Sequence, residues 1–393
     1  MSEIDNIKSF HDELTAWRRD LHAHPEMAYK EDRTSSFVAE KLRSWGIDVH
    51  TGLAKTGVVG TVRNGSGNRA VGLRADMDAL PLQELNGFDH RSKHDGVMHA
   101  CGHDGHTVML LGAARHLAKH RDFDGTVHLI FQPAEEGGGG GKLMIEEGLF
   151  EKFPCDAVFG LHNLPGIPVG KFAVRSGPML ASSDKFEITV AGTGAHGAFP
   201  HQGVDPVPIA AEIIMALQGI VTRNIDPLQS SIISVTQING GMAYNIIPNE
   251  VKMVGTTRAF SPAVRELIER RMGQVVEGIC AAHNAKGTLK YIHGYPPTIN
   301  SVEETDLAAQ AAAKVVGMDN VLFDHPPSMA ADDVAFMLNA KGGSHVLIGN
   351  GVGPGVGEGG CAVHNPNYDF NDKILALGAS FWVRMAETFL AKQ

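Results

Sequence analysis

The sequence predicts an α/β fold with a large domain, in which helices flank a mostly parallel sheet, and a smaller inserted domain of ferredoxin-like βαββαβ order. Three observations predict it. Short apolar runs alternate with helical patterns in the first part of the chain, which is typical of an open α/β sheet. From residue 185 the order becomes strand, helix, strand, strand, helix, strand. After residue 296 helices and a strand resume.

The large domain is expected over residues 1–184 and 297–393. Apolar spacing predicts helices in DELTAWRRDLHAHPE and RTSSFVAEKLRSWG, because residues three and four apart share one helix face. Four apolar runs predict buried strands, and the pattern HTVMLLGAARHLAKH predicts a helix between two of them. The strands are expected at 56–62, 69–75, 126–131 and 156–162, the helix at 106–120, and a final helix from about 372.

The inserted domain is expected over residues 185–296. Its strands are expected at 185–191, 230–238, 250–260 and 287–293, and its helices at 205–223 and 261–283. This order is the ferredoxin-like arrangement. Gly294, Pro296 and Pro297 mark its end, since glycine and proline interrupt regular structure.

Composition excludes several classes of partner. The chain has 393 residues and a net charge of −10, and without a basic block we expect no nucleic acid. The apolar segment 208–221 carries polar residues and is short for a bilayer span, so we expect no membrane. Four cysteines in so long a chain fit a reduced compartment. The polar start lacks an apolar core of signal-peptide length, and we expect a cytoplasmic protein.

Ionisable side chains follow three of the predicted strands. The strand 69–75 leads into Asp76 and Asp78, the next into Glu135 and Glu136, and a third into His162. Ligand sites in open α/β sheets form at the carboxyl ends of the strands. We therefore expect these side chains to share one site.

The stretch MHACGHDGHT adds Cys101 and His103. Two residues apart, they do not share a helix face, so we expect both in a loop before a helix that begins near His106. A thiolate and an imidazole suit zinc-like metals. A redox pair would need a second cysteine nearby, and none exists. A structural cysteine, and a nucleophilic cysteine with a histidine base, stay open.

The metal interpretation gives the other polar residues a task. Neighbours on an extended segment point in opposite directions, so one of Glu135 and Glu136 can bind metal while the other acts as general base. His364 follows a glycine-rich stretch near the end of the chain. It could complete the site, with Cys361 as the rival ligand.

Six motifs together resemble a known family, the amidohydrolase branch of the aminoacylase-type metallopeptidases. They are MHACGHDGHT, FQPAEEG, GLHNLP, VHNPNYDFND, RADMDALP and NIIPNEV. The branch includes hippurate hydrolases, N-acyl-amino-acid amidohydrolases and hydrolases of indole-acetyl amino acids. The resemblance implies two divalent metal ions (zinc, manganese, nickel or cobalt) and Glu135 as general base. The ligands that it implies are Cys101, His103, Glu136, His162 and His364.

The inserted domain resembles the lid and dimerisation domain of that family. The resemblance implies that His196 approaches the substrate carbonyl, with Asn245 beside it, and that Arg258 binds a free carboxylate. His196 could act from its own subunit or from a neighbouring one, and we expect a homodimer or homotetramer. The resemblance to the family assigns no role to Asp76 or Asp78.

The resulting expectation is a metal-dependent amidohydrolase that cleaves N-acyl amino acids, with hippurate-like substrates, to a carboxylic acid and a free amino acid. A metallo-dipeptidase or carboxypeptidase would use the same metals. A non-catalytic binding protein for acyl amino acids is the alternative from another class.

Overall fold

The chain forms two compact units in the computed structural model, which describes residues 3–392. Unit 1 comprises residues 3–177, 299–326 and 333–392, and unit 2 comprises residues 178–298 and 327–332. The chain passes between the units within β7 (Gly177–Leu180) and β14 (Thr298–Asn300), and again before and after residues 327–332. The expected inserted segment 185–296 lies within unit 2.

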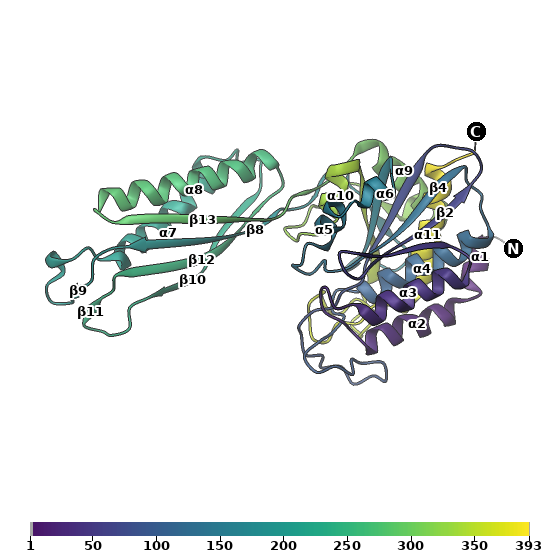
Figure 1. Cartoon of the computed structure of the whole chain (residues 1–393), viewed down its shortest axis with the longest axis horizontal. Coiled ribbons are helices and arrows are strands. Elements are labelled where there is room, and N and C mark those ends of the chain that lie inside the picture. The colour runs from purple at the N-terminus through teal and green to yellow at the C-terminus, as the bar shows by residue number, and fades with distance from the viewer. Residues whose placement is uncertain (1–2, 393) are drawn as a thin grey trace. The chain divides into compact units, whose positions relative to one another are not determined.

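Unit 1 is built on an eight-stranded sheet of order β1-β2-β4-β3-β5-β16-β6-β15 (Figure 1). The central strands β4, β3, β5 and β16 are parallel, while β2 and β1 continue the sheet antiparallel. The strands are β1 (Asp48–Leu53), β2 (Gly57–Asn64), β3 (Ala70–Asp76), β4 (Gly125–Gln132), β5 (Ala157–Pro165), β6 (Phe172–Ala173), β15 (Val321–Leu322) and β16 (Gly343–Gly351).

Helices cover both faces of this sheet. Alternate strand residues point to opposite faces, and one set, including Val58 and Leu129, packs in the larger core. The other set, including Val59 and Ile130, packs in a second core. The larger core contains side chains from α1 (Glu3–Lys8), α2 (His11–Ala23), α3 (Asp32–Ser44), α4 (His103–Lys119), α9 (Val302–Val316) and α11 (Leu375–Phe389). The second core contains side chains from α5 (Gly140–Glu146), α6 (Leu149–Lys152) and α10 (Val334–Lys341).

The central position of β3 explains its composition. Every residue of β3 is buried, because helices cover the strand on both sides and neighbours flank both its edges. The strand carries Arg74 and Asp76 into this interior, where burial of a charge requires a partner. The carboxyl ends of β4, β3 and β5 lie next to one another in the sheet, as the candidate site requires.

Unit 2 has a four-stranded sheet of order β10-β12-β8-β13, in which all neighbours are antiparallel. Its elements follow the expected order and are β8 (Ser183–Ala191), α7 (Pro206–Arg223), β10 (Ser231–Gly240), β12 (Glu250–Ala259), α8 (Pro262–Ala282) and β13 (Lys286–Tyr295). A small sheet of β9 (Ala195–His196) and β11 (Ile246–Ile247) is added. Short 3-10 helices lie at Pro200–Gln202 in this unit, and at Met318–Asn320 and Asp372–Ile374 in unit 1.

Helix α7 explains the most apolar stretch of the sequence. Asp205 caps it by accepting the N–H of Val207 at 3.0 Å, and Pro206 begins it. By length and composition alone this helix could cross a membrane. Ile213 and Leu217, one helical turn apart, are buried in the core of unit 2. The helix therefore packs as a core element of that unit.

Candidate metal centre

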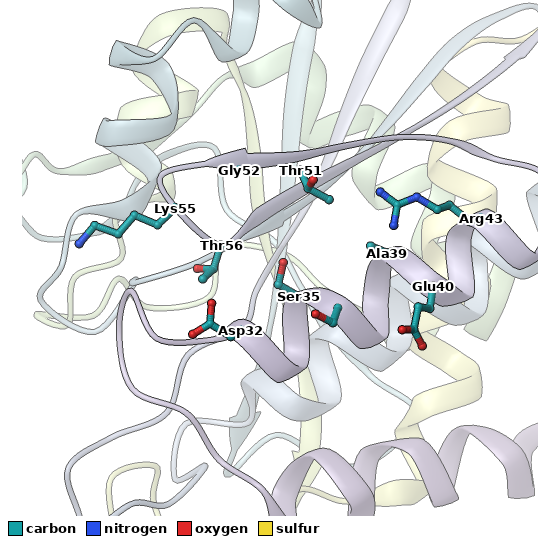
Figure 2. Close-up of a pocket in the computed structure, with 10 residues that line it drawn as sticks. Asp32, Ser35, Ala39, Glu40, Arg43, Thr51, Gly52, Lys55 and Thr56 are labelled. Atoms are coloured by element: carbon teal, nitrogen blue, oxygen red, sulfur yellow. The ribbon is translucent and has the colours of Figure 1, made fainter.

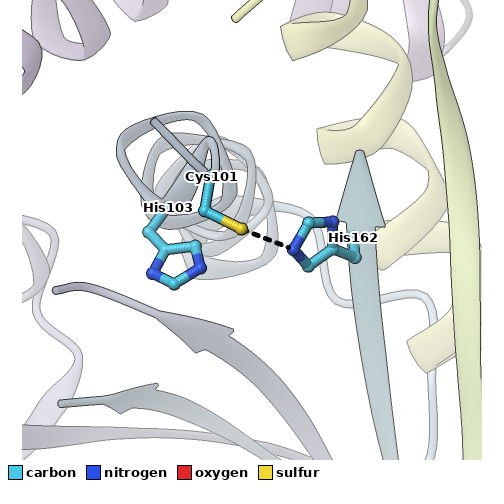
Figure 3. A group of neighbouring side chains, drawn as sticks. All are labelled: Cys101, His103 and His162. Atoms are coloured by element: carbon cyan, nitrogen blue, oxygen red, sulfur yellow. Dashed lines mark hydrogen bonds between the residues drawn. The ribbon is translucent and has the colours of Figure 1, made fainter. Parts of the chain in front are cut away.

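Two groups of side chains that could hold a metal ion share Cys101. In the first group, one donor atom each of Cys101, His103 and His162 lie within 4.8 Å of one another, and Sγ of Cys101 is 3.3 Å from Nε2 of His162 (Figure 3). In the second group, donor atoms of Cys101, Glu136 and His364 lie equally close, with Glu136 Oε1 3.1 Å from His364 Nε2. The structure therefore brings the five expected ligands together around one sulfur.

The start of α4 differs from the sequence expectation. We expected Cys101 and His103 in one loop, but His103 is the first residue of α4. The preceding Gly102 has φ 96°, a left-handed conformation that glycine adopts without strain. A Cβ atom at Gly102 would lie 2.2 Å from Oδ1 of Asn163. Glycine thus lets the chain turn directly from Cys101 into the helix.

Hydrogen bonds orient two of the histidines. Nδ1 of His103 lies 2.8 Å from the carbonyl oxygen of Asp78, and Nδ1 of His162 lies 2.7 Å from that of Asn163. A carbonyl only accepts, so Nδ1 carries a proton in both rings, which leaves Nε2 as the atom that could bind a metal ion. Among the described residues, the buried Nε2 of His103 has no hydrogen-bond partner. A metal-binding histidine is held in this way, so the arrangement fits a divalent cation.

The local electrostatics fit a cation as well. Burial raises the pKa of the Cys101 thiol against the influence of His103 and His364. Hydrogen bonds to Cys101 and Glu136 raise the pKa of His364 to about 10. Both shifts favour the protonated forms, a neutral thiol at Cys101 and a positively charged ring at His364. A divalent ion there would favour thiolate and neutral imidazole instead.

The pair Glu135–Glu136 lies in a turn, whereas we expected an extended segment. Strand β4 ends at Gln132, and residues 135–138 form the turn, in which the N–H of Gly137 donates to the carbonyl of Glu135 at 2.7 Å. Ala134, with φ 56°, starts the change of direction. Donor atoms of His103, Glu135 and Glu136 lie within 4.8 Å of one another. Both carboxylates therefore lie beside the same histidine.

Asp78 connects the parts of the site, a role that the sequence did not reveal. Its Oδ1 accepts the N–H of Glu135 and its Oδ2 accepts the N–H of Glu136, both at 2.9 Å. Its carbonyl oxygen accepts from His103. The sequence located Asp78 after a strand, but nothing in the pattern indicates contacts with backbone groups.

Asp76 and His106 form a second support that the sequence did not reveal. Oδ1 of Asp76 accepts from Nδ1 of His106 at 2.6 Å, and Nε2 of His106 accepts the N–H of Asn163 at 3.0 Å. Arg74 donates to Oδ2 of Asp76 at 2.8 Å. Burial opposes ionisation of Asp76, but His103, Arg74 and His106 outweigh it and hold the pKa of Asp76 well below its usual range. Asp76 therefore lies in this site as a charged neighbour of the histidines.

Comparisons with known proteins identify the family. The model of peptidase family M20/M25/M40 matches residues 72–388. The chain belongs to this family. The hippurate hydrolase of Campylobacter jejuni is 41% identical over 390 residues, which cover 99% of this chain and 100% of that protein. The thermostable carboxypeptidase 1 of Saccharolobus solfataricus is 39% identical, covering 100% of both chains.

A solved M20 structure agrees with this assignment. The YXEP protein of Bacillus subtilis, described as a dinuclear metal-binding peptidase from the M20 family, matches with a TM-score of 0.84. It is 32% identical, and the match covers 98% of this chain and 99% of that one. The expected family, its α/β fold class and its character as an amidohydrolase-type enzyme are thereby confirmed.

The expected substrate-binding residues belong to unit 2 of this M20 chain. His196 pairs with Ile246 between β9 and β11, and the N–H of Gly197 donates to the carbonyl of Asn245 at 2.8 Å. His196 and Asn245 therefore lie together, near the beginning of β12. Arg258 lies at the opposite end of β12, a strand of roughly 30 Å at about 3.3 Å per residue. Within unit 2, Arg258 is thus separated from the other two.

A surface pocket of unit 1 contains none of the expected site residues. It has a volume of about 340 Å³. It is lined by residues of α3 and by Thr51, Gly52, Lys55 and Thr56, as Figure 2 shows. Its lining carries charges of both signs, including Asp32, Glu40, Arg43 and Lys55. This pocket is separate from the side chains grouped around Cys101.

Proposed function

We propose that this M20 chain hydrolyses the amide bond of N-acyl amino acids, with hippurate-like substrates, to a carboxylic acid and a free amino acid. The observation that carries the proposal is the pair of donor groups that share Cys101 beside the carboxylate of Glu135. The name of the C. jejuni relative supports this substrate class. Glu135 is 7% exposed, and a buried acid beside metal donors has little use in a protein that only binds.

The proposed ligands would hold two divalent ions, zinc, manganese, nickel or cobalt. Cys101, His103, Glu136, His162 and His364 would hold these ions. When bound, such ions supply Lewis acidity, which polarises the scissile carbonyl and makes water more acidic. Nitrogen and sulfur donors suit these metals.

Glu135 is the proposed general base. Its carboxylate takes a proton from the attacking water and transfers it to the nitrogen of the leaving amine. The hydroxyl oxygen forms the new bond to the carbonyl carbon, and the carbon–nitrogen bond breaks. Asp78 holds the backbone of Glu135 during this transfer through the 2.9 Å hydrogen bond, so that the base keeps its direction.

Unit 2 would act as the lid and dimerisation domain. His196 and Asn245 would steady the developing charge on the carbonyl oxygen, and Arg258 would bind the substrate carboxylate with its planar fork. The separation of Arg258 from His196 within unit 2 supports contributions from two copies of the chain to each site. A homodimer or homotetramer is therefore part of the proposal.

A cytoplasmic location also belongs to the proposal. All four cysteines are free thiols, which suits a reducing compartment. The net charge of −10 gives no support to a nucleic-acid partner, and the proposal involves no membrane.

The substitution Glu135→Gln tests the proposed base. The amide keeps the size of the side chain but cannot accept a proton, so turnover should fall by roughly 10²–10⁴-fold while metal content after dialysis stays unchanged. The control is Glu146→Gln on the exposed face of α5, which should match the wild type. Full activity in Glu135→Gln would contradict the assignment.

A substrate screen separates the proposed activity from its main alternative, a carboxypeptidase or dipeptidase, which the S. solfataricus relative favours. The purified protein is loaded with each of the four metals and offered hippurate, N-acetyl and longer N-acyl amino acids, and dipeptides. Preferred cleavage of N-acyl amino acids supports the proposal. Preferred cleavage of dipeptides with a free amine would replace it, and saturable binding without turnover would indicate a binding protein.

A further inference from the structure

Glu31 is a fully buried carboxylate that the proposed reaction does not use. It lies between α2 and α3 and is 0% exposed. Oε1 accepts the N–H of Ala134 at 2.9 Å and that of Tyr29 at 3.1 Å. Oε2 accepts from the hydroxyl of Thr56 at 2.6 Å. A buried charge is costly without such partners, so three segments of unit 1 converge on this side chain.

The backbone conformations at these contacts are unusual. Ala134 has φ 56° and Tyr29 has φ 63°, in the left-handed region that is unfavourable for a residue with a Cβ. Such conformations persist where the surroundings enforce them, and they cluster at functional sites. One carboxylate oxygen thus accepts the N–H groups of two strained residues.

Ala134 immediately precedes the two glutamates of the candidate site. Three consecutive N–H groups are accepted by buried carboxylates: Ala134 by Glu31, and Glu135 and Glu136 by Asp78. The conformation of residue 134 sets the direction in which the chain leaves β4. The backbone conformation of residue 134 therefore sets the positions of the Cα atoms from which the side chains of Glu135 and Glu136 extend.

We propose that Glu31 is a positioning residue, which holds the left-handed turn at Ala134 and so directs Glu135 and Glu136 toward the donor cluster. The inference rests on the proposed function, because it assigns a support to the proposed base and to one proposed ligand. Without the carboxylate, Ala134 relaxes toward an extended conformation, and both glutamates move away from His103.

The first test is Glu31→Ala in the metal-loaded protein. We expect kcat to fall roughly 10–100-fold, as for small displacements of catalytic groups, with KM changed less than about threefold. Metal retention in dialysis against a chelator should weaken by about tenfold or more, since residues that orient ligands have this effect. Unchanged kcat and unchanged metal retention would overturn the proposal.

Two rescue variants separate positioning from general stability. Glu31→Gln keeps an oxygen for the two N–H groups and should stay within about threefold of the wild type in kcat and metal retention, because neutral acceptors hold such bonds too. The double variant Glu31→Ala/Ala134→Gly supplies the left-handed turn without the carboxylate, because glycine adopts it freely. It should recover both quantities in large part. If neither variant recovers them, Glu31 does not act through Ala134.

The matched control is Glu26→Ala. Glu26 also accepts two backbone N–H groups, those of Arg33 and Thr34, at 2.9 and 2.8 Å, but it has no contact with residue 134 among these bonds. Its loss should lower the melting temperature and leave kcat and metal retention per folded molecule unchanged. A purely structural role of Glu31 would produce the same result in Glu31→Ala and would refute the proposal.

If Glu31→Ala alone does not fold, the double variant should fold, and failure of both would count against the proposal. If the wild type cleaves no N-acyl amino acid, the proposed function fails. The comparison of metal retention between Glu31→Ala and the double variant would then still test the placement of Glu136.

Discussion

His22 on α2 is a buried histidine between two acids. It is 0% exposed, with Nδ1 2.8 Å from Asp104 and Nε2 3.2 Å from Glu84. Burial favours the neutral ring, but hydrogen bonds to Asp104 and Glu84 outweigh it and raise the pKa of His22 to about 9. Asp104 follows His103 in α4, so this charged pair supports the helix turn that carries a proposed ligand.

The raised pKa of His22 predicts a loss of stability in alkali. A folded-state pKa above the ordinary value of about 6.5 means that the stabilisation is complete below pH 6.5 and is lost as pH rises through about 9. The full contribution is about 3 kcal/mol for such a shift. The free energy of unfolding of the wild type and of His22→Gln is measured in urea at pH 7 and pH 10. The difference between the two free energies should be smaller at pH 10.

The control for this prediction is His283→Gln. His283 pairs with Glu212 at 2.8 Å, but both side chains are about half exposed, and such pairs contribute little. The free energy of unfolding of His283→Gln should differ little from that of the wild type at both pH values. A constant difference between wild type and His22→Gln from pH 7 to 10 would refute the charged state of His22.

At the scale of residues, a sequence indicates candidate metal donors more readily than the side chains that hold those donors in place. Cys101, His103 and His364 could be chosen because thiol and imidazole are metal donors and because whole motifs matched a family. Asp78 could not be assigned, because its carboxylate acts on backbone N–H groups. Every residue except proline has a backbone N–H group. The pattern of side chains in a sequence therefore does not indicate which N–H groups Asp78 binds.

Helix α4, which carries His103, packs closely against neighbouring side chains at two of its glycines. A Cβ at Gly105 would lie 2.3 Å from the ring of Phe370, and one at Gly112 would lie 2.9 Å from Cβ of Ala379. Phe370 follows the segment that carries His364. Close packing at Gly105 thus connects the helix of one proposed ligand with the segment of another.

Gly105→Ala should destabilise unit 1. The Phe370 ring must shift, and overpacking of this kind costs about 1–3 kcal/mol. Urea unfolding measures the loss, and metal retention should weaken with it, because the segment carrying His364 moves. The control Gly219→Ala in α7 has open space around the new methyl group and should stabilise by about 0.5–1 kcal/mol. Stability equal to the wild type in Gly105→Ala would contradict the predicted clash.

At the scale of elements, the eight strands given bounds from the sequence lie within a few residues of their expected places, because buried apolar runs have strand length and clear interruptions. The strands β1, β6 and β15 were not expected. The start of α4 was misplaced by three residues, since it depends on the left-handed Gly102. The turn at Glu135–Glu136 was missed for a related reason. Ala134 is an unlikely residue for a left-handed turn, and its conformation depends on contacts from distant parts of the chain.

At the scale of the whole molecule, the proposed substrate-binding residues of unit 2 lie at opposite ends of one strand. His196 and Asn245 lie at one end of β12 and Arg258 at the other. If each site combines them, two copies of the chain must contribute. Alternating apolar residues and helix caps in the sequence predicted the order of elements in this unit. The separation between His196 and Arg258 depends on the length and register of the strands, which that pattern does not give.

Mixing two inactive variants tests this arrangement. His196→Ala and Arg258→Ala should each lose most activity alone. Subunits mixed at random should regain roughly a quarter of the wild-type activity, because half of the dimers are mixed and each mixed dimer has one complete site. Activity is measured before and after subunit exchange.

The control is each variant taken through the same exchange alone, which should stay inactive. A mixture no more active than its parents would mean that His196 and Arg258 act within one chain. Full-strength activity of the Arg258→Ala protein by itself would remove that residue from the proposal.

The sulfur of Cys101 belongs to both donor groups, which sets how the cluster responds to the loss of a single side chain. Replacing that residue withdraws a donor from both positions in one step. Replacement of His162 or His364 alters only one of them. A variant that lacks the cysteine should therefore retain less metal in dialysis than a variant that lacks either histidine.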